Sequence, residues 1–139
     1  MPEAFHIGEL ARRSGRSIHA IRWYEAQGLM PGVARDGGRR RVYSPDHVLW
    51  LELIDRLRLT GMTIAEIRDY ARKIREGRSA RAQLPAILEA HAARTRERIA
   101  RQREALRLIE RKIAFYNAWL ETGVRPPLPQ PPKPRRNGA

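Results

Sequence analysis

The 139-residue chain contains no cysteine, which excludes disulfides, thiolate metal ligands, thiol-based redox sensing and a cysteine nucleophile. No apolar run approaches the roughly 18 residues that a membrane-spanning helix needs. The opening stretch MPEAFHIGEL lacks the basic region and apolar core of a secretory signal. We therefore expect a cytoplasmic protein that does not use a membrane. The histidines are not spaced as metal ligands, so His6, His47 and His91 are predicted to be surface or structural residues, and no metal is expected.

Acidic residues are scarce beside basic ones: 15 aspartates and glutamates face 28 lysines and arginines, for a formal net charge of +13. Such a surplus indicates an anionic partner, with nucleic acid as the first choice and a membrane surface as the lesser one. A genomic preference for arginine codons would give the same surplus, so charge alone does not decide the partner. The chain also lacks a Ser-His-Asp set and a phosphate-binding loop, so neither an enzyme nor a cofactor is expected.

Two short helices joined by a tight turn are predicted near the N-terminus. Apolar residues recur at helical spacing over 7–13, and a glycine ends that segment. Ser17 is a good N-cap for a second helix that runs from 17 to about 26, with Gly28 in the stop position. Two short helices linked by RSGRS are typical of a helix-turn-helix.

The second of these helices has two different faces. Ile18 and Ile21 share one face, with Tyr24 on its border. The opposite side carries three residues of another kind: His19, Arg22 and Trp23. A tryptophan is an unusual choice for a side chain that faces only water, so this side is a candidate binding surface.

Residues 29–43, LMPGVARDGGRRRVY, change character because Pro31 and Gly32 end the helix. VAR and RRVY are short strand candidates on either side of the turn signal DGG, so a two-stranded hairpin is predicted. Two strands alone are barely stable. The hairpin must therefore pack on the helices or be held by a ligand.

Two further helices are expected to supply the core. Ser44 is the predicted N-cap and Pro45 the first residue of a helix that Gly61 stops. TIAE at 63–66 is a capping box that opens the next helix, which runs to Gly77. The first of these helices has a broad apolar surface made of Val48, Leu49, Leu51, Leu53, Ile54 and Leu57.

A long helix over about 80–121 carries a heptad pattern, in which mostly apolar residues alternate in steps of four and three. Such a helix cannot bury this seam on the domain that precedes it, so a second copy of the chain is the expected partner. The predicted dimerisation residues are Leu88, Ile99, Leu106, Ile109, Ile113 and Tyr116.

Residues 122–139 are rich in proline and arginine and are predicted to be a disordered tail. Lys133, Arg135 and Arg136 within it are candidates for nonspecific phosphate contact. The predicted organisation is therefore a DNA-binding domain over 1–77, a dimerisation helix over 80–121 and this tail.

Taken in order, these segments resemble the MerR family of transcriptional regulators. HIGELARRSG and SIHAIRWYEAQGLM correspond to the helix-turn-helix of that family, RRVYSPDHV to the end of its wing, and LRLTGMTIAEIRDY to the following helices. The resemblance covers residues 5–77 by motif and 80–121 by architecture. It implies a mainly α fold, with a winged helix-turn-helix DNA-binding domain followed by a long coiled-coil dimerisation helix.

The resemblance also implies a function. The expected protein is a homodimer, joined by an antiparallel coiled coil, that binds an inverted repeat of double-stranded operator DNA in an overlong promoter spacer. It would repress by holding the DNA in an unproductive shape, and activate by bending and untwisting it so that RNA polymerase engages both promoter elements. The alternative is an architectural or recombination accessory protein with the same winged domain.

The DNA contacts that the resemblance implies are Ser17, His19, Arg22, Trp23, Tyr24, Arg35, Arg40, Arg41 and Tyr43. His19 stands where the family usually has arginine or lysine, and Trp23 where it has tyrosine or phenylalanine. Arg39 stands where a glycine is usual, which would shift the wing turn by one residue. The indole of Trp23 either packs on DNA sugar or lies under the wing, and Tyr24 serves the core, a phosphate or both.

The end of the long helix, IERKIAFYNAWL, resembles that of a MerR subgroup linked to aldehyde and thiol stress. Thiol chemistry cannot be the trigger in a chain without cysteine, so the effector is unidentified. Four aromatic residues either line an effector pocket near the dimer ends or belong to coiled-coil packing: Tyr70, Phe115, Tyr116 and Trp119.

Overall fold

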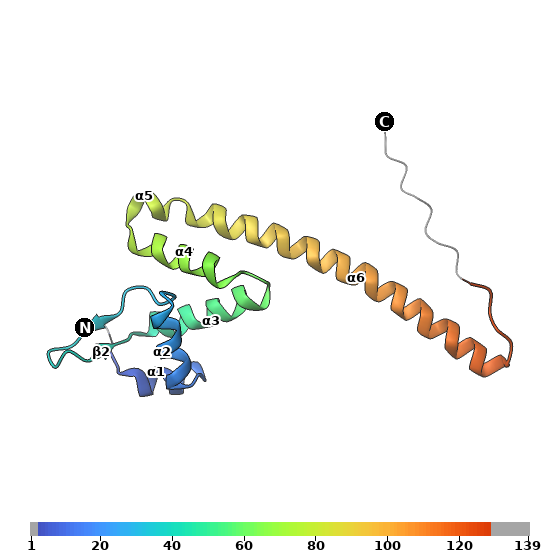
Figure 1. The fold of residues 1–139 in the computed structure, drawn as a ribbon, viewed down its shortest axis with the longest axis horizontal. Coiled ribbons are helices and arrows are strands. Elements are labelled where there is room, and N and C mark those ends of the chain that lie inside the picture. Colours follow the sequence, from blue (N-terminus) through green and yellow to red (C-terminus); the bar gives the residue numbers. More distant parts are fainter. Residues whose placement is uncertain (1–2, 129–139) are drawn as a thin grey trace. The chain divides into compact units, whose positions relative to one another are not determined.

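Helices and one short hairpin make up the part of the chain that the structure, a computed structural model, describes, which is residues 3–128 (Figure 1). The chain divides into two compact units, Met1–Thr95 and Arg96–Ala139. The elements are α1 (Ile7–Ser14), α2 (Ile18–Ala26), β1 (Ala34–Arg35), β2 (Arg41–Val42), α3 (Pro45–Leu59), α4 (Ile64–Arg75), α5 (Arg78–Arg81) and α6 (Leu84–Thr122). The predicted tail contacts Lys133, Arg135 and Arg136 lie outside the described residues.

Helices α1 and α2 form the predicted helix-turn-helix. The turn closes at Gly15, whose φ of 69° is left-handed, and the Ser17 hydroxyl accepts a hydrogen bond from the Ala20 backbone at 3.0 Å. Leu10 and Ile21 are fully buried between the two helices and the rest of the core. Ile21 therefore packs in the core as its spacing predicts, whereas Ile18, which shares its predicted face, is 39% exposed because it lies in the first turn of α2, at the edge of the core.

A largely buried arginine, with a side chain that is 13% exposed, joins this pair of helices to α3. The Arg16 side chain donates to the Tyr24 hydroxyl at 2.9 Å and to the Leu51 carbonyl oxygen at 3.3 Å, and it also pairs with Asp55. The guanidinium group lies over the Tyr24 ring at 5.0 Å. One cation thus joins the turn, α2 and α3, and this fixes the orientation of α2.

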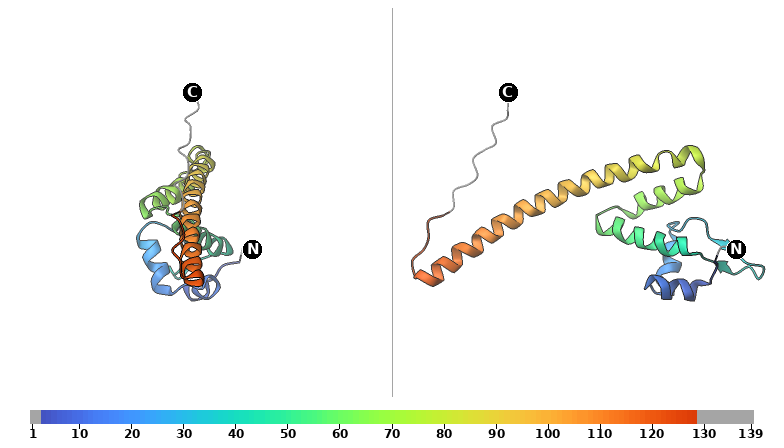
Figure 2. Two further views of the ribbon diagram at one scale, coloured as in Figure 1. Left: turned by 90° about the vertical axis from the view of Figure 1, so that its right-hand side faces the viewer. Right: turned by 180° about the vertical axis from the view of Figure 1, so that it is seen from behind.

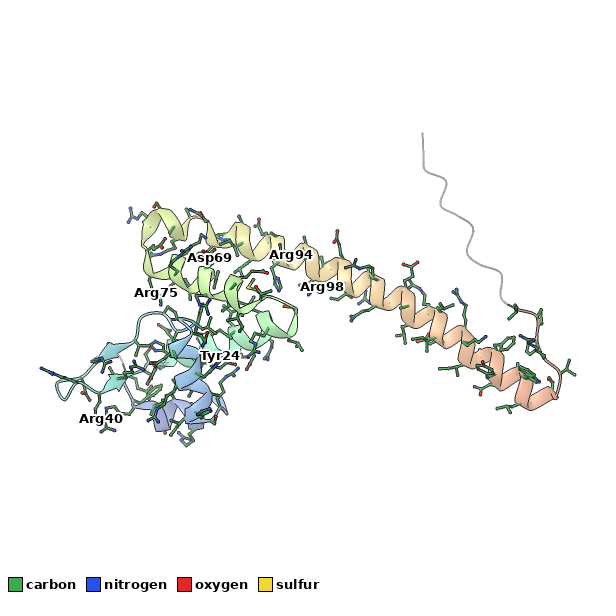
Figure 3. The ribbon with its side chains drawn as sticks, in the orientation of Figure 1. Tyr24, Arg40, Asp69, Arg75, Arg94 and Arg98 are labelled. Carbon is green, nitrogen blue, oxygen red and sulfur yellow. The ribbon has the colours of Figure 1, made fainter. Side chains whose placement is uncertain are left out.

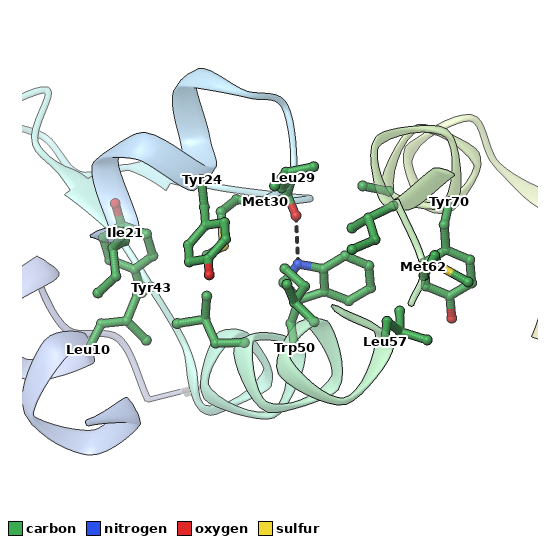
Figure 4. Close-up of a cluster of buried hydrophobic side chains, with 14 of the residues drawn as sticks. Leu10, Ile21, Tyr24, Leu29, Met30, Tyr43, Trp50, Leu57, Met62 and Tyr70 are labelled. Atoms are coloured by element: carbon green, nitrogen blue, oxygen red, sulfur yellow. Dashed lines mark hydrogen bonds between the residues drawn. The ribbon is translucent and has the colours of Figure 1, made fainter. Parts of the chain in front are cut away.

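The core of the first unit lies where α3 crosses α2 on one side and α4 on the other (Figure 4). The Trp50 indole N–H donates to the Leu29 carbonyl oxygen at 2.7 Å, and its ring stacks on Tyr70 with an interplanar angle of 3°. Trp50, which the sequence pattern did not place in the core, is 9% exposed, whereas the predicted core residue Leu49 is 63% exposed. The indole reaches inward because its N–H finds a partner there.

The hairpin of β1 and β2 projects from the helices as a wing (Figures 1 and 2). Ala34 pairs with Val42 and Arg35 with Arg41 in antiparallel register. An isolated bridge between Phe5 and Tyr43 attaches the segment before α1 to the base of the wing. The hairpin is therefore held by packing on the domain, as its small size requires.

The wing turn runs through Arg39, which has a φ of 62° and is the one non-glycine residue with positive φ among residues 3–128. Its N–H donates to the Asp36 carbonyl oxygen at 3.0 Å, and the Asp36 N–H donates to the Arg40 carbonyl oxygen at 2.8 Å. The left-handed conformation thus falls at Arg39 and at neither Gly37 nor Gly38. The arginine occupies the left-handed position of the turn itself, so the one-residue shift that its presence suggested is not needed.

The long helix departs from its prediction at its start. A separate short helix, α5, covers residues 78–81, and α6 begins only at Leu84. Leu84, Ile87 and Leu88 pack against the core of the first unit, and the ring of His91 hydrogen-bonds to the Thr60 hydroxyl at 2.7 Å. The first unit consequently extends to residue 95 instead of 77.

Leu88 is therefore a correction to the predicted seam, because it packs on the core of the first unit. The heptad spacing includes Leu88 because one apolar stripe of α6 packs on the first unit in its first turns and continues, exposed, in the turns that follow. The remaining seam residues are 41–56% exposed on the single chain: Ile99, Leu106, Ile109, Ile113 and Tyr116. They stay available for a second copy.

The predicted aromatic cluster divides between the two units. Tyr70 is buried against Trp50 in the first unit. In the second unit the Phe115 ring meets Tyr116 at 5.5 Å and Trp119 at 6.0 Å, both edge to face. Of the four predicted aromatic residues, only Phe115, Tyr116 and Trp119 therefore form a group within one unit.

No described helix combines the length and apolarity that crossing a membrane requires. Residues 3–128 also hold no group of three or more histidine and acidic side chains placed to bind a metal. His6, His47 and His91 each make hydrogen bonds to other parts of the first unit instead.

Replacing Arg39 by glycine should stabilise the protein. A left-handed conformation costs an L-residue roughly 1–2 kcal/mol, and glycine forfeits about 0.5–1 kcal/mol of that gain through chain entropy. We expect the free energy of unfolding in urea to rise by about 0.5–1 kcal/mol. Arg40→Gly, which removes the same charge from a residue without positive φ, should lower it. A lower free energy of unfolding for Arg39→Gly would contradict the left-handed conformation of Arg39 in the wing turn.

Candidate nucleic-acid interface

Helix α2 presents the predicted binding face to solvent. His19, Arg22 and Trp23 are all exposed, and the Trp23 side chain is 42% exposed. Its ring meets Tyr24 edge to face, with centroids 5.5 Å apart. This exposure favours the interpretation in which the indole faces a partner over the one in which it lies under the wing.

A cationic hollow lies between α2 and the wing. Its volume is about 250 Å³, and it is lined by His6, Ile7, Arg22, Arg35, Arg39, Arg40, Arg41 and Tyr43. Guanidinium groups of a helix and a hairpin therefore line one concave surface, which suits the phosphates of a nucleic-acid strand. The predicted residues Arg22, Arg35, Arg40 and Arg41 come together here. Arg40 is labelled on the wing in Figure 3.

The wing tip is organised by Asp36. Its carboxylate accepts hydrogen bonds from the backbone N–H groups of Gly38 at 3.0 Å and Arg40 at 2.9 Å, and it contacts the His6 ring at 2.9 Å. The His6 contact, followed by the Arg40 N–H, lowers the pKa of the Asp36 carboxyl. A fixed negative charge thus holds the turn while the arginines around it stay at the surface.

Glu25 connects the wing to α2. Its side chain is only 7% exposed, and it accepts hydrogen bonds from the Arg41 guanidinium and from the Tyr43 hydroxyl. Burial raises the pKa of Tyr43, and the hydrogen bond to Glu25 raises it further. Glu25 of α2, Arg41 of β2 and Tyr43, which follows β2, thereby form one charge-assisted network.

This network changes the role expected of Arg41. The sequence places it among the phosphate contacts, but its guanidinium pairs with Glu25 and is 47% exposed. Its main task in the free chain is to position the wing. A nucleic-acid phosphate can still reach the exposed half of the group, since the residue lines the cationic hollow.

Two predicted contact tyrosines belong to the core. Tyr24 is 5% and Tyr43 1% exposed. The Tyr24 hydroxyl accepts hydrogen bonds from Arg16 at 2.9 Å and from Arg58 at 3.1 Å. We therefore assign these tyrosines to the positioning of α2 and β2. Ser17 is likewise occupied as the cap of α2.

Arg68 holds the C-terminal end of α2, a role that the sequence analysis missed. It donates to the Gln27 carbonyl oxygen at 2.6 Å and to the Gln27 side-chain oxygen at 3.0 Å. A Cβ at Gly28, whose φ is 73°, would lie 3.6 Å from the Arg68 side chain. The basic residue of the TIAEIR stretch was visible in the sequence, but its partner 41 residues away was not.

Comparison with known proteins places these features in a family. Residues 5–74 match the family model described as MerR HTH family regulatory protein. An uncharacterised HTH-type transcriptional regulator of Haemophilus influenzae is 30% identical over 112 residues, which cover 81% of this chain and 83% of that protein.

Solved structures agree. A crystal structure of HiNmlR, described as a MerR family regulator lacking the sensor domain and bound to promoter DNA, superposes with a TM-score of 0.74. It is 27% identical and covers 87% of this chain and 96% of its own. A MerR family transcriptional regulator of Listeria monocytogenes gives a TM-score of 0.76 at 28% identity, over 86% of this chain and 90% of its own.

Replacing Glu25 by glutamine should loosen the wing. Glutamine keeps the size of the side chain but loses the charge that faces Arg41. We expect the free energy of unfolding to fall by about 1–2 kcal/mol, a value that allows for the solvent on the Arg41 side. Urea unfolding measures this. Glu9→Gln, which removes a solvent-exposed carboxylate paired with Arg12 and Arg13, is the matched control and should change stability little. Equal stability of Glu25→Gln and the wild type would show that the buried pair is not formed in solution.

Proposed function

The chain belongs to the MerR family of helix-turn-helix regulators, and on that premise we propose that it binds operator DNA as a homodimer and regulates transcription by changing the shape of a promoter. The observation that carries this proposal is the cationic hollow between Arg22 of α2 and the arginines of the wing. A surface of this kind accepts a DNA strand, and the exposed face of α2 beside it fits a major groove.

Arg22 is the residue that reads the DNA in this proposal. It is exposed on α2, and its forked guanidinium suits a guanine edge or a phosphate. His19 and Trp23 flank it on the same side and supply contacts particular to this chain. Arg35 and Arg40 bind the DNA backbone from the wing, while Ser17, Tyr24, Arg41 and Tyr43 hold the reading surface in place.

The homodimer forms through the second unit. Helix α6 exposes Ile99, Leu106, Ile109, Ile113 and Tyr116 at heptad spacing, and a second copy packed antiparallel buries them. Two copies related by a twofold axis present two α2 helices, which match an inverted repeat.

Regulation follows from the cost of deforming DNA. A dimer that holds two half-sites at a fixed separation bends or untwists the promoter between them, and flexible central base steps make this easier. In an overlong spacer, that change decides whether RNA polymerase can engage both promoter elements. We also propose, from the end of α6, that the chain belongs to the subgroup linked to aldehyde and thiol stress. No effector is assigned to it. A footprint between the two promoter elements would support a regulator, and a footprint at a recombination attachment site would defeat it.

Removing Arg22 should weaken and broaden DNA recognition. For Arg22→Ala we expect a loss of roughly 1–3 kcal/mol in operator binding and a smaller preference for the operator over unrelated DNA. Fluorescence anisotropy on operator and scrambled duplexes, at several salt concentrations, measures both quantities. Arg111→Ala is the control because it removes one charge from α6 at a heptad position away from the seam. Unchanged operator affinity of Arg22→Ala would remove α2 as the reading helix.

Two acidic substitutions in the seam should dissociate the dimer. Leu106→Asp with Ile109→Asp places four carboxylates at the centre of the interface formed by two copies, where burial without partners is strongly unfavourable. We expect monomers in sedimentation velocity at concentrations where the wild type is dimeric. Leu108→Asp alters an equally exposed leucine of α6 outside the seam and should leave the dimer intact. A persistent dimer in the double variant would refute the seam.

A further inference from the structure

Arg39 occupies a backbone position that favours glycine. Its φ is 62°, while Gly37 and Gly38, directly before it, do not have positive φ. The chain thus has an arginine at the one position of the turn whose backbone conformation is strained for a residue with a side chain, and two glycines precede it. A strained residue at a functional surface is grounds for asking what its side chain does there.

The strain is held by neighbours on both sides of the turn. The Arg39 N–H donates to the Asp36 carbonyl oxygen at 3.0 Å. The Arg35 guanidinium donates to the Arg39 carbonyl oxygen at 2.9 Å. The Asp36 carboxylate accepts from the N–H groups of Gly38 and Arg40. These contacts fix the backbone of Arg39 without using its side chain.

The Arg39 side chain is exposed and lines the cationic hollow. Over residues 3–128 its guanidinium makes no hydrogen bond or ion pair, in contrast to Arg41, which pairs with Glu25, and Arg35, which bonds to the Arg39 carbonyl. The turn therefore presents a pre-positioned cation whose donors are all available to a ligand.

The position of this cation indicates which groove it meets. Arg22, on α2, and Arg39, at the wing tip, line the same hollow. When Arg22 lies in a major groove, the phosphate strand that borders this groove fits into the hollow. The wing tip then lies beyond that strand, at the adjoining minor groove. Narrow minor grooves of A·T-rich DNA have an enhanced negative potential that attracts arginine.

We propose that Arg39 is a specificity-determining residue that inserts its guanidinium into the minor groove next to each half-site and gives the operator a preference for A·T base pairs there. This inference rests on the proposed function, since it needs α2 in the major groove. It assigns sequence preference to a part of the protein that makes no major-groove contact. In this proposal the strained left-handed backbone is what directs the Arg39 side chain toward DNA from the tip of so short a hairpin.

The test uses the full chain. Operators are first selected from random duplex DNA, and the base pairs adjoining each half-site are then changed to A·T or to G·C, on each side separately. Fluorescence anisotropy gives the ratio of the two dissociation constants. We expect the wild type to bind the A·T version about five- to twentyfold more tightly on one side of the half-site.

Arg39→Gly is the decisive variant because it relaxes the backbone instead of straining it, so a misfolded wing does not explain a loss. We expect it to reduce the flank ratio to below about twofold, while discrimination within the half-sites stays unchanged. Arg39→Lys, which keeps the charge but not the planar fork, should fall between the two. Arg111→Ala should keep the full ratio.

The outcomes separate this inference from the function it rests on. Selection that returns no inverted repeat for the wild type would overturn the proposed function. A clear operator whose flank ratio is about one for the wild type, or is equal in Arg39→Gly and the wild type, would overturn the role of Arg39 alone. Loss of half-site discrimination in Arg39→Gly would overturn it too, because the residue would then only support the reading surface.

Discussion

The buried carboxylate of Glu25 is the contact on which the proposed reading surface depends. It lies on the recognition helix, and its two donors, Arg41 and Tyr43, come from the second strand of the wing and the residue after it. A hairpin of two residue pairs has no stability of its own. The carboxylate, together with the bridge between Phe5 and Tyr43, supplies what the strands cannot. The angle between helix and wing, and with it the hollow proposed to accept DNA, follows from this network.

The arginines of the first unit divide into two groups by what their guanidinium groups contact. Arg16, Arg41 and Arg68 bind carboxylates, hydroxyls or carbonyl oxygens within the unit and hold its helices and wing together. Arg22, Arg39 and Arg40 stand at the hollow. The net charge of +13 therefore overstates the charge available to DNA. In this domain the arginines that pair within the unit position the surface, and the arginines without such a partner form it.

Helix α6 serves both units with one stripe of apolar residues. Its first turns pack Leu84, Ile87 and Leu88 on the core, and Arg94 pairs with Glu66 at 3.5 Å. Beyond residue 95 the same spacing continues on exposed residues such as Leu106 and Ile109. A heptad pattern indicates that a stripe of residues is buried but does not indicate which surface buries it. Periodicity therefore could not show that Leu88 packs on the first unit whereas Ile99 stays exposed on the single chain.

The sequence by itself determined the helix-turn-helix, the wing, the following helices and the family, because caps, glycines and apolar spacing act over a few residues and were all readable. It also predicted Arg22 and the wing residues Arg35, Arg40 and Arg41 as DNA contacts. Tertiary structure decided which arginines pair within the unit, since the partner of Arg41 is 16 residues away and that of Arg68, which the sequence did not single out, is 41 residues away. It also moved Tyr24 and Tyr43 into the core and placed the left-handed residue at Arg39. Local pattern fixes the order and type of the helices and strands, whereas the use of a long charged side chain depends on which distant group the fold brings within reach.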